Sequence, residues 1–231
     1  DEIQECPQAR TAIKFLVEDG RFDFIESGSL LGVNTKTIPS LPVGFETTLT
    51  MYPMDFEEFC WANGVQPQTI ELLKDAFEQK KPLPALIHET MKKLFYAYLV
   101  VGGMPEAVNL YVSSHDVARV MAFQKDILSL YRQDIIKYSA NNSDKIHRVF
   151  DSIAPQLDEK NRRFVLADVD KHARQTRYEN AFLWLNDAGV ALPCYNVTHP
   201  VVPLKLNEKH NLFKLFFCDV GLLTAACMQN V

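Results

Sequence analysis

Asp1–Pro7 (DEIQECP) and Phe24–Ser29 (FIESGS) carry the strongest folding signals in this sequence. Pro7 suits the first position of a helix, and an apolar stripe follows it until Gly20. The stripe consists of Ala9, Ile13, Leu16 and Val17. Arg21–Glu26 predicts a strand, and a polar Ser-Gly-Ser turn suits the carboxyl end of a strand. An acidic pair, a helix, a strand and a turn in this order predict half of an α/β domain, with the helix packed on a sheet.

The acidic pair at Asp1 and Glu2 suggests metal and water chemistry. In nucleotide-hydrolysing α/β domains, one carboxylate after a strand holds Mg²⁺ through its water shell, and the next polarises the attacking water. Ser27 or Ser29 could then sense the γ-phosphate. A solvated acidic end and a plain turn are the competing interpretations. The strand that should precede Asp1 is not among these residues, so we expect the chain to be truncated at its amino end.

Composition describes an ordinary globular chain. Its 231 residues, 47% of them hydrophobic, suffice for a core divided among two or three modules. Five cysteines without a Cys-x-x-Cys pair argue against zinc or a disulfide framework and favour a reducing compartment. No run reaches the length of a membrane span, so we expect a cytoplasmic protein without a membrane partner. The net charge of −5 gives no general attraction to nucleic acid.

The middle of the chain predicts one further strand and then helices. Phe45–Met51 is expected to form the strand, and Asp55 with Glu58 makes a capping-box pattern for a helix that ends at Gly64. Apolar stripes with helical spacing follow, and we expect them to form the core. These stripes are Ile70, Leu73 and Phe77; Leu86, Leu94 and Tyr98; and Val117, Val120, Gln124, Ile127, Tyr131 and Tyr138.

The last third predicts a winged helix-turn-helix. Three helical stripes precede two strand-like segments, Ala191–Val197 and Val201–Leu206, and Phe213–Asp219 also alternates like a strand. The stripes are Ile146, Val149, Phe150 and Ile153; Val169 and Ala173; and Tyr178, Ala181, Phe182 and Leu185. A modest basic patch lies between Glu159 and Tyr178.

If the helix beginning near Gln175 entered a major groove, then Arg174, Gln175 and Arg177 would lie near bases or phosphates. In the alternative, which the acidic charge of the chain favours, the module packs on neighbouring helices and its arginines are solvated.

Five motifs resemble, in their order, those of a bacterial and archaeal family of AAA-type ATPases. They are SGSLLG at 27–32, LPVG at 41–44, MYPMDFEEF at 51–59, VGGMPEAV at 101–108 and DVGLL at 219–223. Members of that family join a P-loop ATPase core to a carboxyl-terminal domain of unknown function, the one numbered 4143. The resemblance implies a mixed, mostly α fold: a partial α/β P-loop core at 1–52, a helical lid at 53–138, and at 139–231 a winged-helix region leading into that domain.

The same resemblance implies roles for single residues. Asp1 would be the Mg²⁺-directed acid of the Walker B motif and Glu2 the catalytic carboxylate, while Ser27 and Ser29 match the sensor segment. Gly103-Met104-Pro105 looks like an element that brings a helical lid over adenine, although a Gly-Gly pair before proline also starts a helix. ATP and Mg²⁺ are therefore the expected cofactors of the intact protein.

Two departures limit these expectations. The sequence contains no Gly-x-x-x-x-Gly-Lys-Ser/Thr, and the loop at Gly32–Thr37 has the wrong spacing for phosphates, so we expect this chain to bind ATP poorly or not at all. The arginine finger is unassigned, with Arg10, Arg119 and Arg132 as candidates. A DNA-binding regulator and a non-hydrolysing scaffold are the rival functions. Self-association is a further expected partnership.

Overall fold

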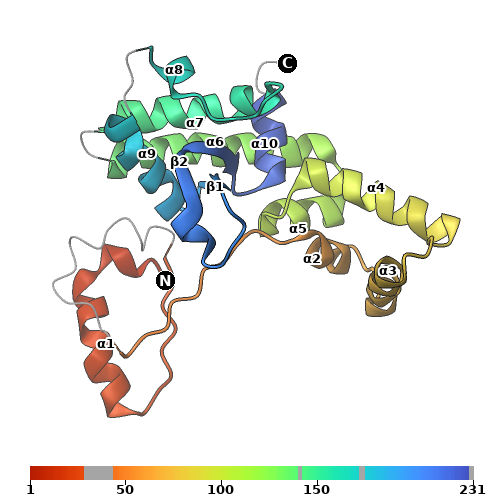
Figure 1. Cartoon of the computed structure of the whole chain (residues 1–231). Helices are drawn as coiled ribbons and strands as arrows, with labels where there is room; N and C mark the ends of the chain where they lie inside the picture. The colour runs from red at the N-terminus through yellow and green to blue at the C-terminus, as the bar shows by residue number, and fades with distance from the viewer. Residues whose placement is uncertain (29–43, 140–141, 172–174, 229–231) are drawn as a thin grey trace.

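The computed structural model describes residues 1–28, 44–139, 142–171 and 175–228 (Figure 1). Within these residues the fold is mixed and mostly helical, with one two-stranded sheet. The elements are η1 (Ile3–Glu5), α1 (Pro7–Asp19), α2 (Phe56–Ala62), α3 (Pro67–Gln79), α4 (Ala85–Val101), α5 (Pro105–Ser114), α6 (Val117–Tyr138), α7 (Ser143–Asp158), α8 (Leu166–Val169), α9 (Gln175–Asp187), β1 (Ala191–Val197), η4 (Leu204–Asn207), β2 (Glu208–Phe217) and α10 (Val220–Cys227). No helix of the described part is long and apolar enough to cross a membrane.

The amino-terminal region contains the predicted helix but not the predicted sheet. The helix α1 begins at Pro7 and ends at Gly20, whose φ of 69° is left-handed. Residues 21–28 and 44–52 form no strand, so both predicted strands, Arg21–Glu26 and Phe45–Met51, are wrong. A strand needs a neighbour to pair its backbone groups, and no described segment pairs with either of them. The predicted loop Thr35–Pro42 lies outside the described residues.

Without a sheet, the apolar face of α1 is only partly covered. Ile13 is buried, but Leu16 and Val17 are 42% and 37% exposed. The prediction of a helix packed on a sheet is therefore wrong for the described residues. Figure 1 shows α1 apart from the helices that follow, joined to them by the extended chain before α2.

The predicted capping box forms at α2. The Glu58 N–H donates to Asp55 Oδ1, and the Asp55 N–H donates to Glu58 Oε2, both at 2.8 Å. This reciprocal pair satisfies two backbone donors at the helix start. It fixes the direction in which the chain leaves the extended segment and enters the helical part.

Two small cores lie among α2 to α6. One gathers Phe59, Val101, Ala107, Val108 and Val120, and the other gathers Cys60, Ile70 and Met91. The predicted stripes supply two of these side chains, Ile70 and Val120. Phe77, Leu86 and Val117 do not follow the prediction, because they are 86%, 81% and 44% exposed.

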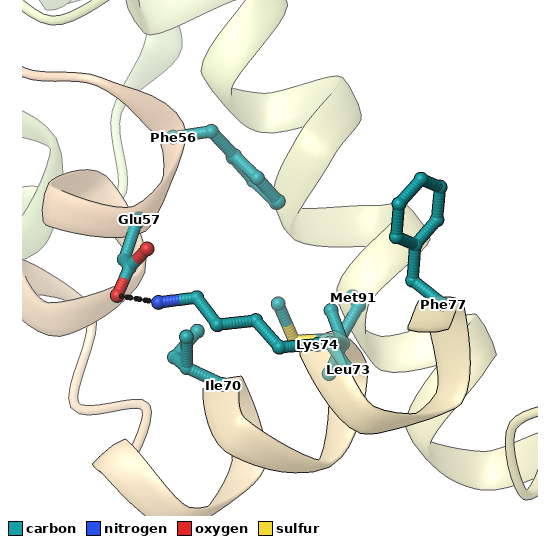
Figure 2. A pocket seen from close by; sticks show the side chains of 7 residues that line it. All are labelled: Phe56, Glu57, Ile70, Leu73, Lys74, Phe77 and Met91. Carbon is teal, nitrogen blue, oxygen red and sulfur yellow. Dashed lines mark hydrogen bonds and ion pairs between the residues drawn. The ribbon is translucent and has the colours of Figure 1, made fainter. Parts of the chain in front are cut away.

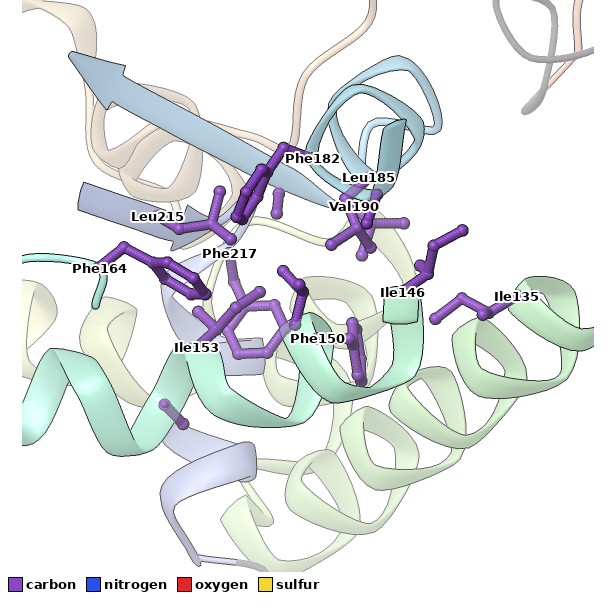
Figure 3. Packing of buried hydrophobic residues seen from close by; sticks show 14 of the residues in the cluster. Ile135, Ile146, Phe150, Ile153, Phe164, Phe182, Leu185, Val190, Leu215 and Phe217 are labelled. Carbon is purple, nitrogen blue, oxygen red and sulfur yellow. The ribbon is translucent and has the colours of Figure 1, made fainter. Parts of the chain in front are cut away.

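The main core lies between α7, α9, the β1–β2 pair and parts of α6 and α10 (Figure 3). Ile146, Phe150 and Ile153 project from one face of α7, as their spacing predicts, and each is no more than 1% exposed. Phe150 meets Phe217 of β2 edge to face, with 5.4 Å between ring centroids. Because Leu128 and Ile135 of α6 join this core, the regions before and after residue 139 pack together.

The strand pair is antiparallel, but its second strand is not the predicted Val201–Leu206. The first strand is Ala191–Val197, as predicted, and its partner is Glu208–Phe217, which contains most of the strand-like segment Phe213–Asp219. Pro203 lacks a backbone donor for a ladder. Val202 and Leu206 are 86% and 81% exposed, so no face of this segment is buried. Residues 204–207 instead form η4, a short 3₁₀-helix.

Asp219 joins α10 to the turn between α4 and α5. Its side chain is buried and accepts hydrogen bonds from the Gly103 N–H at 2.5 Å and the Leu222 N–H at 3.0 Å. Burial raises the pKa of Asp219, and hydrogen bonds from the Gly103, Leu222 and Gly221 N–H groups oppose this. A methyl group at Gly102 would overlap the Asp219 carboxylate, and one at Gly103 would overlap the Met54 backbone. The turn therefore requires both glycines.

Replacing Asp219 with Asn should lower the free energy of unfolding by about 2 kcal/mol. The amide removes a costly buried charge, but it replaces one of the two carboxylate oxygens with an NH₂ group. The backbone N–H that bonded to that oxygen is left unsatisfied, which costs about 1–3 kcal/mol. Asp116→Asn is the matched control, because Asp116 also accepts from two backbone N–H groups, at the start of α6, but in contact with solvent. Its effect should stay within about 0.5 kcal/mol. Urea unfolding measures both, and equal losses would contradict this role of Asp219.

Candidate functional site

Asp1, Glu2 and Ser27 lie together. The Asp1 Oδ1 atom accepts a hydrogen bond from the Ser27 hydroxyl at 2.6 Å and another from the Glu2 N–H at 3.1 Å. The Ile3 N–H donates to the Ser27 carbonyl at 3.1 Å. Two bonds thus hold the bend after residue 26 against the first residues of the chain. Ser29 lies outside the described residues.

Glu2 has an unusual backbone conformation. Its φ is 50°, in the left-handed region that costs a non-glycine residue about 1 kcal/mol or more. This turn directs the chain into η1 while Asp1 folds back toward Ser27. Both acidic side chains of the pair are exposed. Their carboxylates are therefore accessible to a hydrated ion.

A partly buried ion pair near this bend was not predicted from the sequence. Arg10 Nη2 donates to Glu46 Oε1 at 3.0 Å, and their side chains are 10% and 27% exposed. The Nε and Nη1 atoms of Arg10 are buried and have no hydrogen-bond partner among the described residues. Burial and then Glu46 raise the pKa of Glu26, and Arg10 opposes this. The Arg10 guanidinium is therefore hydrogen-bonded to Glu46 and acts on Glu26 through its charge.

The sequence does contain a signal for this pair. Arg10 lies three residues before Ile13, so both share one face of α1. A charged side chain on the apolar face of a helix requires a partner when that face is covered. Its partner Glu46 is distant in sequence, and no spacing rule connects the two.

The acidic pair fits Mg²⁺ bound through water better than a direct metal cage. No group of three or more His, Cys, Asp or Glu side chains in the described part could hold a metal ion. Mg²⁺ usually keeps several waters and uses one or two carboxylates with substrate phosphates. Asp1 and Glu2 are the two carboxylates that such a site would use, and Mg²⁺ here stays a prediction. The sequence supplies no phosphate-binding loop of the Gly-x-x-x-x-Gly-Lys-Ser/Thr type.

Gly103 and Pro105, predicted to contact adenine, form the turn between α4 and α5. The Gly103 N–H donates to Asp219, and its carbonyl accepts from the Met54 N–H at 2.7 Å. Pro105 is the first residue of α5, in agreement with the alternative that this motif starts a helix. The polar backbone groups of Gly103 are thus used within the protein, and the contact with adenine stays a prediction.

The structure describes only some of the residues that were predicted to bind nucleic acid. Arg174 lies outside the described residues, and Gln175 begins α9 but its side chain is not described. Arg177 is exposed on the first turn of α9. Further basic side chains nearby are exposed as well, namely Lys160, Arg162, Arg163 and Lys171. The basic patch therefore faces solvent, as either interpretation requires.

Comparison with known families supports the relation to AAA-type ATPases. Residues 1–60, which contain the acidic pair, Ser27 and the capping box of α2, match the family model described as an AAA domain. The chain belongs to the family described as Domain of unknown function (DUF8612), whose model matches residues 92–230.

The family model that matches the carboxyl-terminal part is DUF8612, and the expected domain numbered 4143 is not confirmed. Two of the five motifs behind that expectation, VGGMPEAV and DVGLL, contain the residues of the contact between Gly103 and Asp219. Both motifs lie within the residues that match DUF8612. No curated protein and no solved structure matches the chain.

Replacing Arg10 with Met should loosen α1. Breaking a buried pair costs about 3–5 kcal/mol, and the partial exposure of Glu46 reduces this to about 2 kcal/mol. Arg21→Met is the matched control, because Arg21 pairs with Asp19 at the surface, where their side chains are 75% and 43% exposed. It should change stability by less than about 0.5 kcal/mol. Hydrogen exchange of the α1 amides measures the effect, and equal protection in the two variants would contradict the structural role of Arg10.

Proposed function

We propose that this chain supplies the magnesium-directing and water-activating half of an ATP-hydrolysing site of the AAA type. The observation that carries this proposal is the hydrogen bond between Asp1 and Ser27 at 2.6 Å. It joins the Walker B acid to the sensor bend within the region that matches an AAA domain.

In this proposal Asp1 is the Walker B acid and the bend at Ser27 is the sensor, and each residue has a separate role. Asp1 accepts hydrogen bonds from waters of the Mg²⁺ shell, and Ser27 holds the Asp1 carboxylate in place. Glu2 takes a proton from the water that attacks the γ-phosphate, which is the role of a general base. Ser29 would contact the γ-phosphate, and the turn at Gly103 and Pro105 would close over adenine. When bound, Mg²⁺ neutralises charge on the phosphates.

The cradle for the phosphates must come from residues other than these 231, because they contain no P-loop motif. The chain alone should therefore bind ATP weakly. Its five free cysteines support a reducing compartment, and we propose the cytoplasm.

Glu2→Gln should abolish ATP turnover in a protein that joins this chain to a phosphate-binding loop. Loss of a general base lowers kcat by about 100-fold or more, whereas ATP binding should change little. Glu18→Gln, an exposed carboxylate on α1, is the control and should retain full turnover. Phosphate release and nucleotide binding are measured separately. Undiminished turnover in Glu2→Gln would favour the scaffold alternative, in which the acidic pair takes no part in catalysis.

A second proposal concerns DNA. The helices α7, α8 and α9 followed by the β1–β2 pair have the element order of a winged helix, and Arg177 is exposed at the start of α9. In this position the amino-terminal turn of a recognition helix contacts bases or phosphates. In the alternative, the same module packs on the lid and communicates nucleotide state.

Arg177→Ala should weaken a salt-dependent mobility shift if the module binds DNA. The slope of log K against log salt should decrease by about 1, because one phosphate contact is lost. Arg119→Ala, an exposed arginine on α6, is the control and should leave the shift unchanged. The absence of any shift of the unmodified chain at low salt would exclude the DNA proposal.

A further inference from the structure

An apolar groove opens between α2, α3 and α4 (Figure 2). Its volume is about 240 Å³, and Ile70 and Met91 form its floor with exposures of 7% and 6%. Leu73 and Phe56 line it above the floor. An apolar cavity of about 150 Å³ already holds a benzene molecule. The groove is therefore large enough for a phenyl ring.

Phe77 stands at one end of this groove. Its ring points away from the floor and is 86% exposed, although Ile70 and Leu73 of the same helical face are covered (Figure 2). Burial of such a ring contributes about 1.5–3 kcal/mol, so leaving it in water beside an apolar groove is costly. The surface formed by α2, α3 and α4, called this face below, thus carries both a protruding ring and a groove that could hold one.

Two charged side chains, Glu57 and Lys74, also line this groove. Lys74 Nζ donates to Glu57 Oε1 at 2.9 Å across the rim of the groove, and the side chains are 60% and 34% exposed. This pair makes the rim electrically neutral, so the rim does not repel the same rim of a second copy turned by a two-fold axis.

We propose that this face binds a second copy of the chain, with α3 packed antiparallel to α3 of the partner. Seven residues separate Ile70 from Phe77, which is about 10 Å along the helix axis. A two-fold axis near residues 73 and 74 therefore places Phe77 of each copy opposite Ile70 of the other. Phe77 enters the groove of the partner, and the two copies exchange the same contact.

Light scattering after size-exclusion chromatography tests this proposal on the chain of 231 residues. The unmodified chain should form dimers as its concentration rises, and Phe77→Glu should weaken dimerisation at least tenfold. Thermal unfolding of the variant should be unchanged, because the ring is exposed. Phe15→Glu is the matched control, since Phe15 is also a largely exposed phenylalanine on a helix, α1, and it should dimerise normally.

A mixing experiment distinguishes this interface from any other. Glu57→Lys gives a rim with two cations, and Lys74→Glu gives a rim with two anions. Each variant alone should be monomeric, and an equimolar mixture of the two should restore the dimer. Only charges that meet between copies produce this result.

Three outcomes would overturn the proposal. The first is a chain that stays monomeric at all concentrations up to about 1 mM, the upper range of weak association. The second is a dimer that survives Phe77→Glu or is lost in Phe15→Glu. The third is a mixture of the charge variants that stays monomeric.

Discussion

The buried carboxylate of Asp219 is the interaction on which the helical part of the structure depends. It satisfies the Gly103 N–H at the end of α4 and the Leu222 N–H at the start of α10, so one side chain joins segments more than a hundred residues apart. Beside it, Gln124 donates to the Val101 carbonyl at 2.7 Å, and Gly221 lies against Gln124. Such a carboxylate is stable only when backbone donors compensate its desolvation. Gly102 and Gly221 have no side chain, so Asp219 can lie against Gly102 and Gln124 against Gly221.

The helices could be predicted from the sequence because their signals are local. Pro7 and Gly20 mark the ends of α1, and the pattern of Asp55 and Glu58 predicts a capping box that the structure contains. The two strand predictions were wrong because a strand is stable only when another segment pairs with it. Arg21–Glu26 and Phe45–Met51 have strand-like composition, but no described segment pairs with them.

The candidate site shows the same division between local and distant signals. Asp1 and Ser27 were each singled out from local motifs, and the hydrogen bond between them at 2.6 Å is a contact that only the structure provides. The Arg10–Glu46 pair was not predicted, since its partners are thirty-six residues apart and belong to no shared motif. Phe77 was expected in the core because helical spacing shows which residues share a face, but not whether another element covers that face.

The candidate site lies in the part of the chain with the fewest buried side chains. Among residues 1–28 and 44–52, only Arg10 and Ile13 are buried in the described structure. Few apolar contacts make local opening inexpensive, so the order of this region depends strongly on the Asp1–Ser27 and Arg10–Glu46 contacts. A ligand that binds only the closed form at 100 times its Kd adds about 2.7 kcal/mol. This exceeds the net contribution of one hydrogen bond, about 1 kcal/mol. A Mg²⁺–nucleotide complex engaging Asp1 would therefore determine whether this region is ordered, whereas the Asp219 core would remain folded in either state.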